Sequence, residues 1–322
     1  MEKNKLISIV IPCYNEEGNI GNTLDGLLEL EGKNNYSFEI IAVNDGSKDK
    51  TWEVIRKYAN THPNIKGVNQ MGNFGQSCAY MAGFDIANGE YIIIVSADME
   101  TPLENISKVI EYLDDGYDFV NTNRVGRWGG GKSGRAKKSD LANTIIGKIS
   151  KVHMEDRGSG MKGFRRNVAK NLRLYGEMHR FIPDYVSVYA PRMIEFDVEF
   201  KDREFGVSYY KGHKRTLKVL LDLVTLYFML YFARKPFKAM PGRLFGFTGA
   251  VLSSVGGIIG FYLLVLKIMG ESIGNRPLLT LAVLLIILGI QSLMFGMLGE
   301  LMMRTYFEST GRKTYMAREI IE

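Results

Sequence analysis

The stretch Tyr91-Ile-Ile-Ile-Val95-Ser96-Ala97-Asp98-Met99-Glu100-Thr101-Pro102 joins a run of β-forming residues to a turn that carries two carboxylates. The apolar run predicts a buried strand that ends near Val95. In open α/β folds, ligands bind in the crevice outside the carboxyl ends of the strands, so Asp98 and Glu100 are placed to meet a substrate or a cation. A simpler interpretation is that Asp98 caps the helix that Pro102 opens, because acids and proline favour helix starts.

The chain on either side of this stretch alternates strand and helix patterns at short intervals. Strands are predicted at Leu6 to Ile11, Phe38 to Val43, Ile65 to Asn69, Tyr117 to Thr122 and Met193 to Phe200, and helices at Glu16 to Leu30, Phe74 to Ala87 and Leu103 to Leu113. This alternation predicts an α/β fold with a mostly parallel, Rossmann-like sheet. The carboxyl ends of parallel strands meet at one edge, so Asn15, Asp45 and Asp98 should converge on one crevice.

Charge and cysteine content narrow the class of protein. A formal net charge of +6 and a pI near 9.0 suit nucleic acid, an anionic membrane surface or phosphate-bearing substrates. The basic patches interleaved with aromatic residues that nucleic-acid binders carry are not evident, so no nucleic-acid partner is expected. Cys13 and Cys78 have no metal-binding spacing and form no disulfide framework, which fits a reducing cytoplasm. The apolar run from Leu6 is too short for a signal peptide, so no cleaved signal is expected.

Two long apolar segments near the end of the chain predict a membrane hairpin. Leu244 to Ile268 and Leu278 to Leu298 each approach the ~20 residues that span a bilayer. The chain then divides into a cytoplasmic domain (1–215), an interfacial helix (216–241), a hairpin (242–304, with spans at about 244–268 and 278–300) and a cytoplasmic tail (305–322). Basic residues flank the outer ends of both spans, which predicts a multi-pass cell-membrane protein with both termini cytoplasmic. Gln291, inside the second span, is expected to bond across the hairpin.

Several motifs, in order, give the chain a resemblance to known enzymes. The motifs Pro12-Cys-Tyr-Asn-Glu-Glu17, Val43-Asn-Asp-Gly-Ser-Lys-Asp-Lys-Thr51, Asn73-Phe-Gly75 and Ala97-Asp98 resemble those of family 2 glycosyltransferases with the A-type fold. The segments Gly176-Glu-Met-His-Arg-Phe-Ile-Pro183 and Arg203-Glu-Phe-Gly-Val-Ser208, with the terminal hairpin, resemble polyprenyl-phosphate glycosyltransferases of the dolichyl-phosphate mannose synthase type. Each motif alone is weak, but the resemblance covers nearly the whole chain in the same order.

The resemblance implies an A-type glycosyltransferase domain at residues 1–215 and a specific class of reaction. Such an enzyme moves one sugar, with inversion, from a nucleotide sugar, expected to be UDP-linked, to undecaprenyl phosphate or another polyprenyl phosphate. The product would be a polyprenyl-phosphate sugar for cell-envelope glycan modification, made at the cytoplasmic membrane face. The lipid bilayer is then a partner, and the hairpin could also join copies of the chain into a homo-oligomer.

The implied reaction calls for a divalent cation. A sugar that leaves a nucleoside diphosphate builds negative charge on the diphosphate, which a cation with hard oxygen ligands stabilises best. The family usually carries Asp-x-Asp followed two residues later by Gln, whereas this chain has Ser96, Asp98 and Glu100 at these positions. We interpret Asp98 and Glu100 as ligands of Mg²⁺ or Mn²⁺ and leave the role of Ser96 open.

The acceptor phosphate needs cations rather than a strong base, because a phosphate monoester with a second pKa of about 6 is already largely ionised. Arginine suits the phosphate oxygens best, because its guanidinium can donate two parallel hydrogen bonds. By resemblance, Arg124 matches the family's acceptor-phosphate arginine. Lys138 could replace a second basic residue of the family. The Ser159-Gly160 loop with Arg165 resembles the acceptor-side loop, and Asp156 could orient sugar or phosphate or simply cap that loop.

The donor side draws on several segments. By resemblance, Arg203 reaches the donor diphosphate, with a surface salt bridge as its alternative role. Asp45 would bind base or ribose, while Asn44 stands where the family often has Asp. The implied nucleotide-sugar site contains Pro12, Tyr14, Glu16, Asn44, Asp45, Asp98 and Arg203, and the implied catalytic residues are Asp98, Arg124, Asp156 and Arg203.

Two alternatives remain for the function. A processive membrane polysaccharide synthase would need more spans and a Gln-x-x-Arg-Trp motif, but the Arg127-Trp128 pair has Arg124 in the glutamine position and lies too early. A non-catalytic membrane scaffold could keep the fold after loss of the acid at Ser96. The presence of Asp98 and Arg203 favours an active, metal-dependent glycosyltransferase.

Overall fold

A computed structural model describes residues 5–33, 36–126, 152–174, 176, 178–188, 190–201, 241–308 and 317–321 of the chain. The chain forms two compact units, Met1–Leu230 with Lys313–Glu322, and Tyr231–Arg312. The expectations for Lys138, Arg203 and nearly all of the interfacial helix at 216–241 fall outside the described residues. The first unit carries the predicted site, and the second carries the two long apolar segments.

The described part of the larger unit contains an eight-stranded sheet in the order β7-β5-β6-β4-β1-β2-β3-β8. The strands are β1 (Leu6–Cys13), β2 (Ser37–Asn44), β3 (Ile65–Gln70), β4 (Tyr91–Ile94), β5 (Phe119–Val125), β6 (Lys162–Arg165), β7 (Met193–Glu199) and β8 (Ala317–Ile321). β1 is parallel to β2 and β4, β2 to β3, and β5 to β7, whereas β6 is antiparallel to β4 and β5. The predicted α/β fold with a mostly parallel sheet is confirmed.

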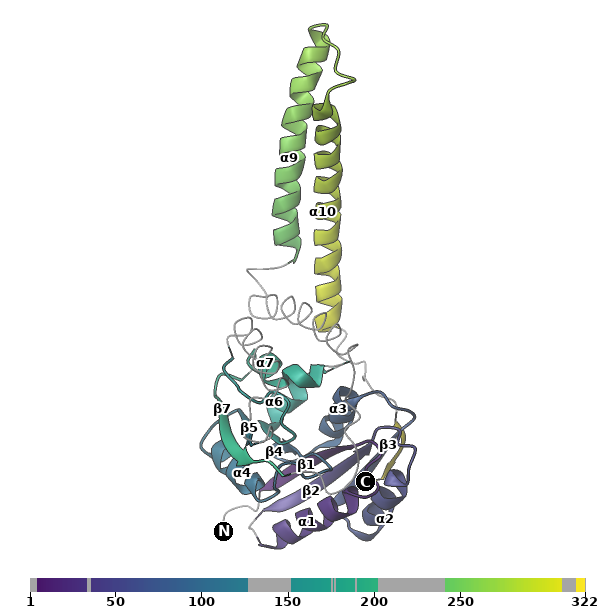
Figure 1. Ribbon diagram of the computed structural model, residues 1–322, viewed down its shortest axis with the longest axis vertical. Helices are drawn as coiled ribbons and strands as arrows, with labels where there is room; N and C mark the ends of the chain where they lie inside the picture. Colours follow the sequence, from purple (N-terminus) through teal and green to yellow (C-terminus); the bar gives the residue numbers. More distant parts are fainter. Residues whose placement is uncertain are drawn as a thin grey trace. The chain divides into compact units, whose positions relative to one another are not determined.

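Helices cover both faces of this sheet, which explains why its strands are continuous apolar runs. One face carries α1 (Ile20–Lys33), α2 (Thr51–Thr61) and α4 (Asn105–Asp114). The other carries α3 (Gln76–Ile86), α6 (Arg166–Asn171), the 3₁₀ helix η1 (Met178–Phe181) and α7 (Ile182–Val186). Along β1, Ile7 and Ile9 enter the first core and Val10 enters the second. Figure 1 shows α1 and α2 on one side of the strands and α3 on the other.

Strand register brings the carboxyl ends of the parallel strands to one edge of the sheet. Cys13 of β1 lies beside Asn44 of β2, and Asn44 lies beside Asn69 of β3. β4 runs parallel to β1 and ends at Ile94, so residues 95–100 leave the sheet at the same edge. We call this edge the site edge. It collects the polar residues that the sequence predicts to converge.

Residues 317–321, which lie in the predicted cytoplasmic tail, form the edge strand β8. β8 pairs antiparallel with β3, with Ile321 opposite Gly67 and Ala317 opposite Gln70. This pairing covers N–H and C=O groups of β3 that a free sheet edge would offer to other chains. The chain therefore leaves the larger unit before the apolar helices and rejoins it after them.

The described part of the smaller unit consists of two long helices, α9 (Pro241–Ile268) and α10 (Pro277–Glu308), which form the hairpin in Figure 1. Within them, Leu244–Ile268 and Pro277–Gly299 are long and apolar enough to cross a membrane. The side chains of Phe247, Phe261 and Met297 are 67–72 % exposed. A surface of this kind is unfavourable in water and suits lipid. The two segments agree in position with the predicted spans.

Small residues let α9 and α10 approach closely. A Cβ added to Gly249 would lie 2.7 Å from the carbonyl oxygen of Gly289, a closeness typical of helix pairs in membranes. The hydroxyl of Ser292 lies 3.1 Å from that of Thr248 and makes a polar link between the helices. Gln291 is exposed, one residue away from this contact. The expectation that Gln291 bonds across the hairpin stays a prediction, and Thr248 and Ser292 make the polar contact next to it.

Candidate active site

Asp98 lies in a tight turn directly after β4. The N–H of Met99 donates to the carbonyl oxygen of Ser96 (3.3 Å), and the N–H of Glu100 donates to Oδ1 of Asp98 (3.3 Å). Met99 has a φ of 50°, which bulky side chains rarely adopt. Within the described ranges, the other non-glycine residue with positive φ is Asn15, just after the neighbouring β1. Backbone strain thus gathers at the site edge, as it often does at functional sites.

The helix that follows this turn begins too late for Asp98 to cap it. α4 starts at Asn105, and Glu104 occupies its N-cap position. The Asp98 side chain is partly exposed instead and lines a cavity. The simpler interpretation of Asp98 as a helix cap is therefore wrong.

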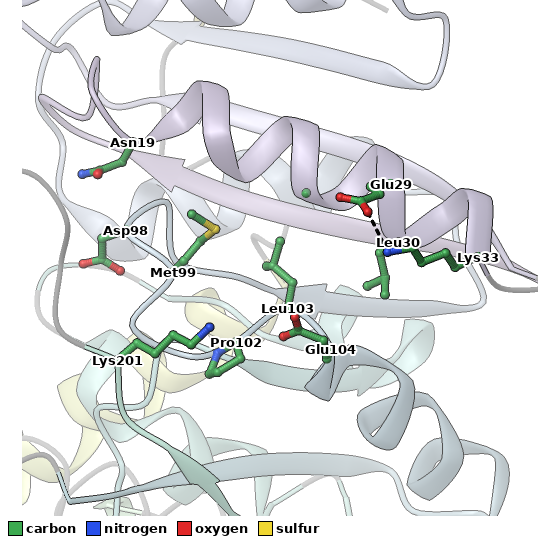
Figure 2. Close-up of a pocket in the computed structure, with 11 residues that line it drawn as sticks. Asn19, Glu29, Leu30, Lys33, Asp98, Met99, Pro102, Leu103, Glu104 and Lys201 are labelled. Carbon is green, nitrogen blue, oxygen red and sulfur yellow. Dashed lines mark hydrogen bonds and ion pairs between the residues drawn. The ribbon is translucent and has the colours of Figure 1, made fainter.

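A cavity of about 280 Å³ opens beside Asp98, between α1 and the segment 98–104. Figure 2 shows Asp98 and Asn19 at one end of this cavity and Lys33 at the other. Lys33 pairs there with Glu29 (2.6 Å). The cavity thus meets the site edge at Asp98, where a ligand can reach the carboxylate.

Arg124, at the end of β5, is the centre of a buried group of ion pairs. Its Nε and Nη2 donate to the two carboxylate oxygens of Asp156 (2.6 and 3.0 Å), and its Nη1 donates to Oε2 of Glu100 (2.7 Å). Nη2 also donates to the carbonyl oxygen of Gly158 (2.6 Å). Burial favours a lower pKa for Arg124, but the hydrogen bond to Asp156 and the nearby carboxylates raise that pKa overall, so the guanidinium stays charged. We call Arg124, Asp156 and Glu100 the Arg124 cluster.

The Arg124 cluster changes the picture that the resemblance implies. The sequence predicts that Glu100 binds a metal and that Arg124 binds the acceptor phosphate, but the structure pairs the two residues with each other. The Arg124 side chain is only 3 % exposed, and its hydrogen bonds already use both of its edges. Asp156 anchors the arginine rather than merely capping its own loop. The roles of Glu100 and Arg124 stay predictions, and each now requires the cluster to open.

Asp45 follows β2 and holds the loop that follows β3. Its Oδ1 and Oδ2 accept the N–H groups of Phe74 (2.8 Å) and Gly75 (2.9 Å). These bonds join the Asp45 motif to the Asn73-Phe-Gly75 motif at the start of α3. Burial raises the pKa of Asp45 to about 6, against the opposing effect of the two hydrogen bonds.

Hydrogen bonds also join the loops that follow β1 and β2. The N–H of Asn15 donates to Oγ of Ser47 (3.0 Å), and the N–H of Ser47 donates to Oδ1 of Asn44 (3.2 Å). Nδ2 of Asn44 in turn donates to Oδ1 of Asn69 on β3 (2.8 Å). The structure therefore gathers most residues of the expected nucleotide-sugar site along the site edge, namely Pro12, Tyr14, Glu16, Asn44, Asp45 and Asp98.

The Ser159-Gly160 loop packs against the Asp98 turn. A Cβ added to Gly160 would lie 2.7 Å from Oγ of Ser96, so this contact requires glycine. The Ser159 side chain is buried, and its hydroxyl shares a hydrogen bond with that of Thr122. Ser96 is thus a packing contact of the loop, and Ser159 keeps the loop on the end of β5.

Arg165 lies at the opposite edge of the sheet, so the expectation that it joins the acceptor-side loop is wrong. β6 runs antiparallel to β4, which places Arg165 beside Tyr91 at the start of β4. Its Nε donates to the carbonyl oxygen of Tyr117 (3.1 Å). Lys162 occupies the site-edge end of β6, where it is buried and donates to the carbonyl oxygen of Ser159. Sequence reasoning missed Lys162, because a lysine within a short strand normally signals a solvent-facing position.

Comparison with protein families shows which family this chain belongs to. The chain matches the family model described as Glycosyl transferase family 2 over residues 8–173, more than half of its length. The chain belongs to glycosyl transferase family 2. The match includes the Asp45, Asp98 and Arg124 segments described above.

Curated relatives align with this glycosyltransferase over almost its whole length. The dodecaprenyl-phosphate galacturonate synthase of Rhizobium johnstonii is 34 % identical, across 98 % of this chain and 93 % of the relative. The undecaprenyl-phosphate 4-deoxy-4-formamido-L-arabinose transferase of Aeromonas hydrophila is 32 % identical, across 98 % of this chain and 94 % of the relative. The similarity therefore includes the segments beyond the family match.

Solved glycosyltransferase structures share the fold of the larger unit. Glucosyl-3-phosphoglycerate synthase from Mycobacterium tuberculosis, in complex with Mn²⁺ and UDP-glucose, aligns with a TM-score of 0.52 and 13 % identity over 70 % of this chain and 79 % of that one. Mannosyl-3-phosphoglycerate synthase from Rubrobacter xylanophilus aligns with a TM-score of 0.52 and 16 % identity over 69 % and 73 %. At such low identity the likeness is evidence for the fold alone.

The side chains at the site edge of this glycosyltransferase that could bind a cation meet its requirements only in part. Across the described residues, no group of three or more His, Cys, Asp or Glu side chains is arranged to hold a metal. Asp98 is partly exposed beside the cavity, whereas Glu100 is committed to Arg124. One carboxylate completed by substrate phosphates is a usual way to bind Mg²⁺. Asp98 therefore fits a cation that arrives with a nucleoside diphosphate.

Proposed function

We propose that this glycosyltransferase transfers one sugar, with inversion, from a nucleotide sugar to a polyprenyl phosphate, with UDP and undecaprenyl phosphate as the expected substrates. The observation that carries the proposal is the convergence of Asp45, Asp98 and the Arg124 cluster on the site edge. The names of the relatives support a polyprenyl-phosphate acceptor. The two helices apolar enough to cross a membrane support a lipid substrate.

In the proposed reaction, a phosphate oxygen of the lipid attacks the anomeric carbon of the sugar. The bond from that carbon to the diphosphate breaks, and its electron pair leaves on the nucleoside diphosphate. Because the attacking oxygen is already ionised, no residue has to remove a proton. Asp45 and the loop it holds would bind the nucleoside, and Asp98 would hold the divalent cation that accompanies the diphosphate. A divalent cation, Mg²⁺ or Mn²⁺, supplies charge neutralisation at the leaving diphosphate when bound.

Arg124 would bind the acceptor phosphate by exchanging partners. Carboxylate and phosphate both accept two parallel hydrogen bonds from a guanidinium, so the phosphate can take the place of Asp156 without loss of geometry. Glu100 pairs with Nη1 of Arg124, so it can stay in place while the phosphate replaces Asp156 at Nε and Nη2, and it would have to leave Arg124 in a separate step to bind a cation beside Asp98. Arg203, Lys138 and Ser159 keep the roles that the resemblance implies, and Arg165 has none.

We place the larger unit and both termini on the cytoplasmic side of the membrane. Basic residues that flank the outer ends of the hairpin support this orientation. The chain returns to the larger unit as β8, so the segment between the two parts of that unit should cross the membrane an even number of times. A homo-oligomer through the hairpin stays a prediction.

The alternative functions are less well supported. A processive synthase needs a membrane channel for its product, and the described part of the chain offers two spans. A non-catalytic scaffold has no need for the strained turn that presents Asp98 beside a cavity. The relatives are named as a synthase and a transferase.

The test is synthesis of a lipid-linked sugar. Purified protein with Mn²⁺, undecaprenyl phosphate and a panel of nucleotide sugars should give a polyprenyl-phosphate sugar, identified by mass spectrometry. Asp98→Asn should lower the rate at least about 100-fold without changing the melting temperature, because a metal site contributes several kcal/mol to such a step. Glu111→Gln removes an exposed carboxylate from α4 and should leave the rate unchanged. Absence of product with every donor, together with poor nucleotide binding, would favour the scaffold.

A further inference from the structure

Glu195, on β7, holds two consecutive backbone groups of the loop that contains Asp156. Its Oε2 accepts the N–H of Glu155 (2.7 Å), and its Oε1 accepts the N–H of Asp156 (3.2 Å). A carboxylate suits this position because its two oxygens accept hydrogen bonds separately. Neither the motifs nor the family comparison assigns Glu195 a role.

Asn121, the neighbour of Glu195 across the β5–β7 pair, completes this support. Its Nδ2 donates to Oε1 of Glu195 (2.6 Å) and to the carbonyl oxygen of Asp156 (3.0 Å). Asp156 is therefore fixed at both its N–H and its carbonyl oxygen. Its carboxylate, held in this orientation, accepts hydrogen bonds from Arg124, and Arg124 also donates to Glu100.

Glu100 connects this series of contacts to the expected metal ligand. Its N–H donates to Oδ1 of Asp98 within the strained turn. We propose that Glu195 is a positioning residue for the Asp98 turn and acts on it through the Arg124 cluster. The inference rests on the proposed function, in which the Asp98 turn binds the donor diphosphate.

The variant Glu195→Gln tests the inference. It keeps the size of the side chain but replaces one acceptor oxygen by an NH₂ group, which meets a backbone N–H as donor against donor. Hydrogen–deuterium exchange of the Glu155 amide, the Asp156 amide or both should accelerate at least about tenfold, because the one remaining oxygen cannot replace the two separate acceptors of the carboxylate. Calorimetric binding of a nucleoside diphosphate with Mn²⁺ should weaken about tenfold, as when the supports of metal ligands are removed. The probe is whichever of UDP, GDP and ADP binds the wild type most tightly.

Asp197→Asn is the matched control. Asp197 lies two residues further along β7 and accepts a hydrogen bond from Asn123 of β5 (2.8 Å), in the same cross-strand arrangement. It should leave amide exchange at the Asp156 loop and nucleotide binding within about twofold of the wild type. Unchanged exchange in Glu195→Gln would overturn the assigned contacts. Faster exchange with unchanged nucleotide binding would overturn the positioning role and leave Glu195 a purely structural residue.

A second variant covers a failure of Glu195→Gln to fold. Glu195→Asp keeps the charge and both oxygens but withdraws them by one methylene, so binding should weaken by less than in the glutamine variant. Wild-type affinity in Glu195→Asp would contradict the inference. Failure of the proposed acceptor reaction alone is recognised separately, because the wild type would then bind nucleotide and Mn²⁺ but transfer no sugar to polyprenyl phosphate. Poor nucleotide binding by the wild type would overturn both the proposed function and the inference.

Discussion

At the scale of single residues, Asp45 has a raised pKa, and its effect can be measured in solution as a pH dependence. Its pKa of about 6 in the folded chain exceeds the ~3.9 of an unfolded aspartate. The folded state therefore binds more protons than the unfolded state between pH 4 and 6, and the contribution of Asp45 to stability falls as pH rises through that window. Above pH 6 the carboxylate accepts the N–H groups of Phe74 and Gly75.

Donor binding should therefore weaken as pH falls below about 6. Protonation of Asp45 turns one acceptor oxygen into a donor, and the loop at Phe74 and Gly75 loses a partner. The measurement is the Kd of a nucleotide sugar from pH 5 to 8, since its diesterified diphosphate does not titrate there. Asp45→Asn should bind more weakly at pH 8 and show a flat profile. The same pH dependence in both proteins would assign the titration to another group.

At the scale of elements, the loops that follow β2 and β3 meet at one glycine. Gly46 has a φ of 65°, and a Cβ there would lie 2.4 Å from the carbonyl carbon of Gly72 and 2.5 Å from the backbone nitrogen of Asn73. The obstacles are backbone atoms, which cannot rotate away as a side chain can. Gly46 therefore sets the spacing between two strand ends of the site edge.

Gly46→Ala should destabilise the larger unit by about 1–3 kcal/mol, because both the backbone angle and the close contact resist a side chain. Thermal unfolding in detergent measures the effect. Gly72→Ala is the matched control in the facing loop, since its Cβ would meet no atom within 4 Å. Equal melting temperatures for the two variants would show that the loops adapt to the added methyl group.

Element boundaries show where local patterns stop being informative. The sequence predicts β1 and β2 correctly, because a short run of consecutive apolar residues is a local signal for a buried strand. The first helix is predicted from Glu16, whereas α1 begins at Ile20, since the preceding loop is held by contacts to residues 47–51. Arg165 is misplaced for a similar reason, because the direction of β6 depends on its pairing with β4.

At the scale of the whole molecule, the path of the chain is itself informative. The larger unit is built from residues on both sides of the two apolar helices in sequence. A unit whose parts precede and follow a hairpin of two spans needs both ends of that hairpin on one side of the membrane. This argument is independent of the basic residues that flank the spans. It requires only that both ends lie on one side, and the basic residues are the reason for proposing the cytoplasmic side.

Cysteine labelling should therefore show that the connector between the two helices and the larger unit lie on opposite sides of the membrane. Gly274→Cys, in the exposed connector between the helices, should react with a membrane-impermeant maleimide in intact cells, because it is expected on the outer face. Gly32→Cys, exposed on α1, should react only after lysis. The native Cys13 and Cys78 are buried and give a low background. Labelling of Gly32→Cys in intact cells would show that the larger unit lies on the outer side, opposite to the proposed orientation.

The sequence by itself determined the class of fold, the two apolar spans and the edge of the sheet at which Asp98 lies. These features follow from local signals: the periodicity of apolar residues, the length of apolar runs, and acids placed directly after strands. Only the tertiary structure decided the partners of the site residues, such as Glu100 with Arg124, Asp156 with Glu195, and β8 with β3. Those pairs join segments far apart in the chain, and strand order and direction, which no local pattern encodes, bring them together.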